Sequence, residues 1–277
     1  MLGVLLALSA SLMWGFADYL GGLQTRTRQV FAVVLISQAA GMVVIVGVVA
    51  GRGVAWPGVD AMYPAAIAGV IGAFCIVTFY LALSYGPVSI VAPVLASSAT
   101  IPVVYGLIRG ERPSTLQLAG LAATLAGVIL VSWTDSDDHE HGRRGIAFAV
   151  LAAVLLGVLL VIFSRASAAD PYWAPFVLRL FSMSTIIAIV LLRRVSVRVD
   201  RRGVMVIATV GALDVLANLA YSVSTTLQLL AITAVLSSLF PVVTVALARL
   251  HLGERVSRIQ ESGAVLTMAG VLLVAAG

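Results

Sequence analysis

Ten apolar runs of similar length constrain this chain more than any other feature of its sequence. An α-helix needs roughly 20 apolar residues to cross the hydrocarbon core of a bilayer, and its backbone must satisfy its own hydrogen bonds there. Because 61% of the 277 residues are hydrophobic and 10% are charged, the chain falls outside the soluble globular class. We therefore predict an all-α, multi-pass protein of the plasma (inner) membrane. The ten predicted spans are residues 2–20, 30–50, 62–84, 90–108, 115–133, 146–163, 172–192, 204–226, 232–250 and 257–276.

An internal repeat relates the two halves of the chain. The stretch GERPSTLQLAGLAATLAGVILV, which begins at Gly110, resembles GERVSRIQESGAVLTMAGVLLV, which begins at Gly253, 143 positions later. Each half has five spans, an odd number, so the second half must enter the membrane in the opposite sense and form an inverted repeat. We predict a first five-helix repeat over residues 1–134, an acidic linker loop over 135–144 and a second repeat over 145–277. Glycines also recur at a spacing of 142 residues, namely Gly3 with Gly145, Gly15 with Gly157, and Gly69 with Gly211.

The predicted linker, DSDDHEHGRR, contains two of the three histidines of the chain. His139 and His141 lie beside acidic residues, as metal ligands can, but a charge run of this kind is more typical of a solvated loop. We expect all three histidines, His251 included, to lie in loops. The sequence has no zinc-ligand spacing, nucleophile elbow or phosphate-binding GxxxxGK. An ATP-driven pump is excluded within this chain, and we expect no cofactor, no metal and no enzymatic activity.

The basic residues, 17 in number, are all arginine. Twelve of them lie in connections that follow odd-numbered spans, and four lie in connections that follow even-numbered spans. Basic loops tend to stay in the cytoplasm, so this distribution predicts that both termini lie outside it. The same loop bias accounts for the net charge of +5, and we expect no nucleic-acid partner.

Three ionisable side chains lie within predicted spans: Asp18, Arg179 and Asp214. A charge at the bilayer centre costs about 2.5 to 3.5 kcal/mol on insertion scales, so such residues mark functional sites by default. Asp214 is near the middle of its span, and Asn218 and Tyr221 follow it at helical spacing, so the three share one face. We predict that Asp214 is the centre of a substrate- or proton-binding site, in preference to a hydrogen bond that only joins two helices.

Asp18 extends the helical face of Trp14 in the first span. Because this acid is about one turn from the predicted end of the span, a position facing the interior and one reaching the headgroups are equally favoured. As an alternative to proton binding, Asp214 can serve as the counter-charge of an amine, whose charge can also lie over an aromatic ring face. Trp14, Tyr80 and Tyr221 are our candidates for that role.

Arg179 falls opposite Ser37 or Gln38 when the two halves are aligned. We favour a cavity-facing position for this arginine over snorkelling to the lipid headgroups. Asp18 and Arg179 are predicted near opposite membrane faces, so we expect no direct pair between them. Asp214, at mid-depth, is placed to meet either one.

The fourth and ninth predicted spans each contain proline and a pair of serines. Pro93, Pro102 and Pro241 remove backbone hydrogen bonds, so the freed carbonyls can face a cavity. The serines either line that cavity or permit close helix packing, and packing is slightly favoured. Cys75, the single cysteine, is predicted to be a small packing residue. The serine pairs are Ser97 with Ser98 and Ser237 with Ser238.

The five-plus-five duplication, the Trp14 and Gly15 pair, and the Gly-Glu-Arg sequences at Gly110 and Gly253 resemble EamA-type members of the drug/metabolite transporter superfamily. The resemblance covers the whole chain. It implies a secondary transporter of small metabolites, often an exporter, with a central cavity between the halves and no bound cofactor. It also implies cytoplasmic termini, against the arginine distribution. The sixth span departs from the pattern, because Leu156 stands where the first span has its tryptophan.

These observations favour a secondary transporter that exports small polar or zwitterionic, amino-acid-like solutes by alternating access, with protons as a candidate coupling ion. The rival within transport is efflux of aromatic or quaternary-ammonium compounds, for which Arg179 is not needed. An intramembrane enzyme with Asp18 and Asp214 as a carboxylate pair is remote, because their predicted depths differ by roughly 10 Å at about 1.5 Å per residue. A receptor role is a further remote alternative, since it leaves the polar stripe without a purpose. The expected partners are a small-molecule substrate and the lipid bilayer, and the sequence contains no signal for an oligomeric state.

Overall fold

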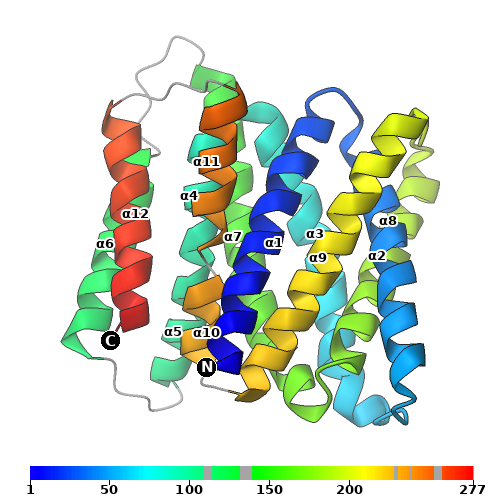
Figure 1. Ribbon diagram of the computed structural model, residues 1–277. Helices are drawn as coiled ribbons and strands as arrows, with labels where there is room; N and C mark the ends of the chain where they lie inside the picture. The colour runs from blue at the N-terminus through cyan, green and yellow to red at the C-terminus, as the bar shows by residue number, and fades with distance from the viewer. Residues whose placement is uncertain (109–113, 132–138, 228–229, 238, 253–257, 277) are drawn as a thin grey trace.

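The computed structural model describes residues 1–108, 114–131, 139–227, 230–237, 239–252 and 258–276, and these residues form helices and no strand (Figure 1). Six helices are long and apolar enough to cross a membrane. The all-helical prediction is confirmed for this part of the chain. The six are α1 (Leu2–Thr25), α2 (Val30–Arg52), α3 (Val59–Tyr85), α7 (His139–Ala169), α8 (Trp173–Arg193) and α9 (Arg201–Leu227).

Two of the predicted spans, 90–108 and 232–250, are divided, which corrects the expectation of one unbroken helix at each place. Pro102 is the third residue of α5, and Pro241 is the second residue of α11. N–H groups in a first turn have no acceptor within the helix, so proline fits there but prevents the helix from continuing upstream. The pieces are α4 (Val88–Ala96), the 3₁₀ turn η1 (Ser97–Ala99), α5 (Thr100–Ile108), α10 (Leu230–Ser237) and α11 (Phe240–Leu252), beside the undivided α6 (Thr115–Val131) and α12 (Arg258–Ala276).

Helix α1 continues past its predicted end at residue 20 and reaches Thr25. Two glycines in this extension face α3: a Cβ on Gly21 would overlap the hydroxyl of Tyr80, and one on Gly22 would lie 3.1 Å from Leu83. The glycines therefore allow a close approach of α3 and do not end the helix. Asp18 consequently lies about two turns from the end of α1, deeper than the one turn that we expected.

Helix α7 begins at His139, earlier than the predicted start at residue 146. The second part of the predicted linker loop, residues 139–144, is therefore helical, and the first part, 135–138, lies outside the described residues. The expectation that all three histidines occupy loops is wrong, because His139 and His141 lie in α7 and His251 lies in α11. A run of charged side chains does not prevent a helix when the helix extends beyond the bilayer into water.

The main contacts of α1, α3 and α6 are with helices of the other half. Helix α1 packs against α9, α3 packs against α7, and α6 pairs with α12 at one side of the bundle (Figure 1). Three pairs of glycines that recur in the sequence occupy corresponding contacts, and each of these glycines lacks a Cβ where a neighbouring backbone approaches. Gly15 faces the carbonyl of Phe240 as Gly157 faces that of Ser98, Gly69 faces Leu178 as Gly211 faces Ser37, and Gly127 faces Thr267 as Gly270 faces Thr124.

Contacts between connecting segments join the two halves at both ends of the bundle. Arg28, after α1, donates a hydrogen bond of 2.5 Å to Asp200, just before α9. This hydrogen bond, aided by one from the backbone of Gly203, holds the pKa of the Asp200 carboxyl below its usual range. At the opposite end the guanidinium of Arg52, in α2, lies 3.6 Å from the ring centre of Tyr172, just before α8. Figure 1 shows the α1–α2 and α8–α9 connections at the end away from the N-terminus, and the end of α12 at the same end as the N-terminus.

Candidate functional site

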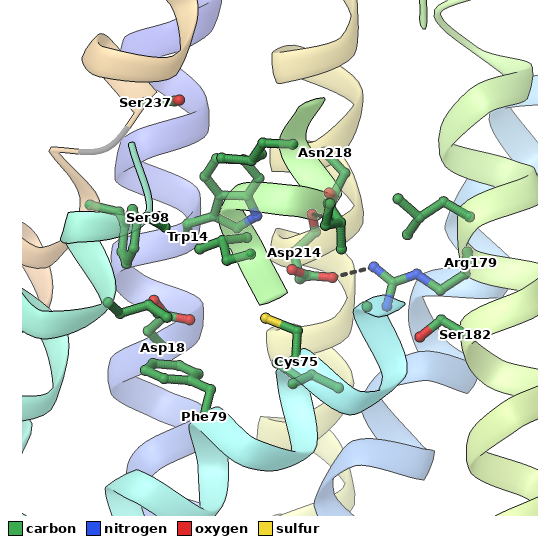
Figure 2. A pocket seen from close by; sticks show the side chains of 18 of the residues that line it. Trp14, Asp18, Cys75, Phe79, Ser98, Arg179, Ser182, Asp214, Asn218 and Ser237 are labelled. Atoms are coloured by element: carbon green, nitrogen blue, oxygen red, sulfur yellow. Dashed lines mark hydrogen bonds and ion pairs between the residues drawn. The ribbon is translucent and has the colours of Figure 1, made fainter. Parts of the chain in front are cut away.

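A cavity of about 110 Å³ lies where the six long helices meet the divided spans. This volume has room for several water molecules or a small solute. An apolar wall of the cavity is formed by leucines of α7 together with Ile76, Phe79 and Phe240. Polar groups from both halves of the chain project into the cavity (Figure 2). The polar lining residues are Asp18, Gln38, Ser98, Arg179, Ser182, Asp214, Asn218 and Ser237.

The strongest electrostatic contact in the cavity is an ion pair between Arg179 of α8 and Asp214 of α9 (Figure 2). The second guanidinium nitrogen, Nη1, donates to Oε1 of Gln38 in α2 at 2.5 Å, and the Gln38 amide donates to Ser182 at 3.0 Å. The Arg179 side chain is 3% exposed, and that of Asp214 is 29% exposed. The arginine is therefore a buried group held by two helices, whereas the carboxylate retains a surface toward the cavity.

Small residues on α2 and α9 create the space for this arginine. A Cβ on Gly41 would lie 3.1 Å from the guanidinium carbon of Arg179. Gly211 faces the backbone carbonyl of Ser37 so closely that no side chain fits between the two helices. The close approach of α2 and α9 brings Gln38 of the first half within hydrogen-bonding distance of Arg179.

Asp18 lines the same cavity from α1, one turn after Trp14, and is partly exposed. Among the residues that the structure describes, it has no hydrogen-bond or ion-pair partner. Figure 2 shows Asp18 and Arg179 on opposite sides of the cavity, with Asp214 between them. The cavity thus contains one carboxylate joined to a guanidinium and one carboxylate without a counter-ion.

The polar stripe predicted on α9 is only partly present. Asn218 lines the cavity, and its amide donates to the carbonyl of Asp214 at 2.7 Å. Tyr221 does not line the cavity: it is fully buried, with its ring centre 5.7 Å from that of Trp14 and 6.2 Å from that of Phe163. Tyr221 thus supports the Trp14 ring from behind.

Tyr80 also lies away from the cavity, because its hydroxyl end fills the space beside Gly21 of α1. Its neighbour Phe79 lines the cavity instead. Successive residues of a helix point about 100° apart, so the rotation of α3 about its axis determines whether Phe79 or Tyr80 faces the cavity. The Tyr80 ring, which we expect from the sequence to offer a cation-π face in the cavity, instead packs against α1 at Gly21.

A sequence model of the EamA-like transporter family matches residues 1–133 and 143–276. The chain belongs to this family. The resemblance drawn from the sequence is therefore confirmed, and the chain is a multi-pass membrane transporter with a small-molecule substrate. A search of curated proteins finds no match. A solved crystal structure, described only as that of a protein, is 19% identical with a TM-score of 0.72, covering 98% of this chain and 95% of that chain. This likeness shows the fold alone.

The cavity of this EamA-family chain includes residues that sequence reasoning missed. Cys75, predicted as a packing residue, lines the cavity and is 7% exposed. Ser98 and Ser237, for which packing was favoured, also line it. Gly72, Cys75 and Phe79 recur at helical spacing on α3, a signal hidden because apolar residues surround them on every face. Ser182, one turn after Arg179, follows the same rule and was detectable.

The polar groups of the cavity suit an organic solute. Carboxylates, amides, hydroxyls and one guanidinium project into it, and groups of this kind recognise polar or charged organic molecules. No cluster of three or more His, Cys, Asp or Glu side chains that could hold a metal occurs in the described ranges. Ser238 and the Gly-Glu-Arg sequences at Gly110 and Gly253 lie outside those ranges.

Proposed function

We propose that this EamA-family protein is a secondary active transporter that exports a small organic solute across the plasma (inner) membrane by alternating access. In this proposal, residues 1–134 and 145–277 form two inverted five-helix repeats that meet over residues 135–144. The divided spans, with α6 and α12, supply four crossings beside the six long helices. The central cavity is the solute site, reached from one side of the membrane at a time.

One observation supports the proposal most strongly: the Arg179–Asp214 ion pair and Gln38 meet at a cavity lined by both halves. Charges within a bilayer are costly, and replacing a buried ion pair by apolar residues is often neutral or stabilising. Packing alone therefore gives no reason for these groups. A polar solute that enters the cavity gives them one.

Polar or zwitterionic, amino-acid-like solutes fit a cavity that contains both signs of charge. A cavity carboxylate can exchange a proton for the solute, so protons are the candidate coupling ion. Efflux of aromatic or quaternary-ammonium compounds is the alternative. Arg179→Ala separates the two, because it should impair transport of zwitterions and spare organic cations, and equal loss of both would indicate a structural arginine.

The arginine distribution supports an orientation with both termini outside the cytoplasm. The connections that follow α1 and α8, which contain Arg26, Arg28, Arg194 and Arg198, lie at the end of the bundle away from the N-terminus (Figure 1). By the positive-inside rule this end faces the cytoplasm. A reporter active only in the cytoplasm, fused after Gly277, should be inactive in cells, and an active fusion would reverse the orientation.

Transport by purified protein in liposomes tests the proposed function. With an imposed pH gradient, the wild-type protein should move at least one solute of a panel of amino acids, amines, nucleosides and cationic dyes faster than protein-free liposomes. Asp214→Asn should abolish the gradient-driven component, and Asp60→Asn, which changes an exposed acid at the start of α3, should retain it. Movement of no solute would count against a transporter, and wild-type rates in Asp214→Asn would remove Asp214 from the mechanism.

An intramembrane protease is disfavoured by the partners of the two acids. A carboxylate pair requires both acids to face one reacting group, whereas Asp214 is joined to Arg179, and Asp18 lies on the opposite side of the cavity from Arg179 (Figure 2). A receptor gives no reason for a charged pair at a cavity shared by both halves.

A further inference from the structure

We infer that the cavity binds its solute as a small organic monocation, with Asp18 as the counter-ion of the charged nitrogen. The inference rests on the proposed function, and of the two solute classes named there it selects organic cations over zwitterions. It also changes the expected centre of the site from Asp214 to Asp18.

Among the residues that the structure describes, those with a formal charge at the cavity are Asp18, Asp214 and Arg179. With both carboxylates ionised, two acids and one guanidinium give a formal charge of −1. Arg179 and Asp214 neutralise each other in their ion pair, so the remaining charge is that of Asp18. An uncompensated charge in a low-dielectric interior is costly. A cation that enters the cavity removes this cost, whereas an anion increases it.

Arg179 is not available to a solute carboxylate. One of its terminal nitrogens donates to Asp214 and the other to Gln38. Its third nitrogen, Nε, is fully buried and has no partner among the described residues, so it does not open onto the cavity. Each terminal nitrogen has a second N–H group, but the Arg179 side chain is only 3% exposed. A solute carboxylate therefore meets little of the guanidinium, whereas a cation meets Asp18 without breaking any contact.

Three aromatic rings line the cavity that contains the free carboxylate. Trp14 precedes Asp18 by one helical turn, and Phe79 of α3 lies beside Asp18 (Figure 2). Phe240 of α11 packs edge-on against Trp14 at a ring-centre distance of 6.2 Å. Ring faces attract ammonium groups, and more strongly when water is excluded. The leucines of α7 and Ile76 supply an apolar surface for the rest of the molecule, which favours an alkyl- or aryl-substituted ammonium over a bare inorganic cation.

Cys75 provides a reporter for the charge of the cavity. It is the single cysteine of the chain, and it lines the cavity (Figure 2). Three methanethiosulfonates that differ in charge measure the local potential: a cationic trimethylammonium-ethyl reagent, an anionic sulfonatoethyl reagent and a neutral methyl reagent. Because all three react with the thiolate, their ratios do not depend on how readily Cys75 ionises.

We expect the cationic reagent to modify wild-type Cys75 at least about tenfold faster than the anionic one, after correction for their rates with a free thiol. Asp18→Asn should remove most of this preference, Asp18→Glu should keep it, and Asp60→Asn should leave it unchanged. Equal rates for the two charged reagents would overturn the inference, as would an undiminished preference in Asp18→Asn. Reaction of the neutral reagent alone would also overturn it, because a small organic cation must then be unable to enter.

The same measurements separate failure of the inference from failure of the proposed function. If not even the neutral reagent reacts, Cys75 is closed to water and the cavity is not a solute site. In liposomes, transport of benzyltrimethylammonium that Asp18→Asn abolishes supports the inference. Transport confined to zwitterions or anions contradicts the inference but agrees with the proposed transport function. Movement of no solute at all counts against the proposed transport function itself.

Discussion

Arg179 of α8 and Asp214 of α9 form an ion pair at the wall of a cavity inside the bundle, and the same guanidinium binds Gln38 of the first half. One buried side chain thereby joins three helices and both family-matched segments. Arg179 neutralises Asp214 and donates a hydrogen bond to Gln38. Asp18 is therefore the carboxylate without a counter-ion in the described part of the cavity.

Breaking the pair from one side should destabilise the protein more than removing both charges. Arg179→Gln leaves Asp214 uncompensated, so we expect a loss of about 3 kcal/mol or more in the free energy of unfolding. The double variant with Asp214→Asn should recover part of this loss, giving a coupling energy of about 2 kcal/mol. Unfolding in detergent of the wild type, both single variants and the double variant measures the coupling, and additive losses would show that the pair is not formed.

Tyr221→Phe should stabilise the protein. The Tyr221 hydroxyl is buried and has no hydrogen-bond partner among the described residues, and an unsatisfied buried hydroxyl costs about 1 to 3 kcal/mol. Phenylalanine keeps the ring contacts with Trp14 and Phe163, so the midpoint of thermal unfolding should rise while transport is unchanged. A loss of transport in this variant would return Tyr221 to the solute site, as the sequence had suggested.

The sequence predicted the six long helices well, because twenty consecutive apolar residues have few alternatives in a membrane. It did not predict the divisions before Pro102 and Pro241, since proline can either kink a spanning helix or begin a new one. It also placed Asp18 too close to a helix end, because Gly21 and Gly22 look like a break until Tyr80 and Leu83 are seen to pack on them.

The charged residues of the candidate site were predictable, because a charge within a membrane span is costly and rare. The apolar residues of the site were not, because similar residues occur on every face of the spans. Arg179, Asp214 and Asp18 stand out as charges in apolar runs, and all three line the cavity. The choice of Phe79 over Tyr80 depends on the rotation of α3, which an apolar helix does not encode in its sequence. Whether each charged group is paired or free to meet a solute depends on contacts between helices that are distant in sequence. These contacts change the expected role of Asp18.

Glycine replacement should have opposite effects at two positions of the bundle. Gly211→Ala places a methyl group against the backbone of Ser37, so α2 and α9 must separate, at a cost of about 2 kcal/mol or more. Gly47→Ala is the matched control, because its Cβ would enter open space on an exposed face of α2, and it should stabilise the helix by about 0.5 to 1 kcal/mol. Thermal unfolding of the two variants should shift in opposite directions, and a neutral Gly211→Ala would contradict the close contact of α2 with α9.

The stability contributed by the Arg28–Asp200 contact should depend on pH. The hydrogen bond from Arg28 holds the pKa of Asp200 below its usual range in the folded protein, so the unfolded chain takes up its proton first as pH falls. The stabilisation is therefore complete above the unfolded pKa of about 3.9 and disappears as pH falls through the lower folded value. Unfolding of wild type and Asp200→Asn should differ at neutral pH and converge in acid. Because Asp200 is exposed, high salt should reduce the difference, and a difference that persists in acid and high salt would exclude the ion pair as its origin.

Protection of Cys75 by the transported solute tests the central claim most directly, namely that solute occupies the cavity between the two halves. The rate at which the neutral methanethiosulfonate modifies Cys75 should fall as the solute is added, with half-protection at the concentration that gives half-maximal transport in the same liposomes. A solute that is transported at saturating concentration and leaves the modification rate of Cys75 unchanged would contradict the account, because transport would then proceed without occupancy of this cavity.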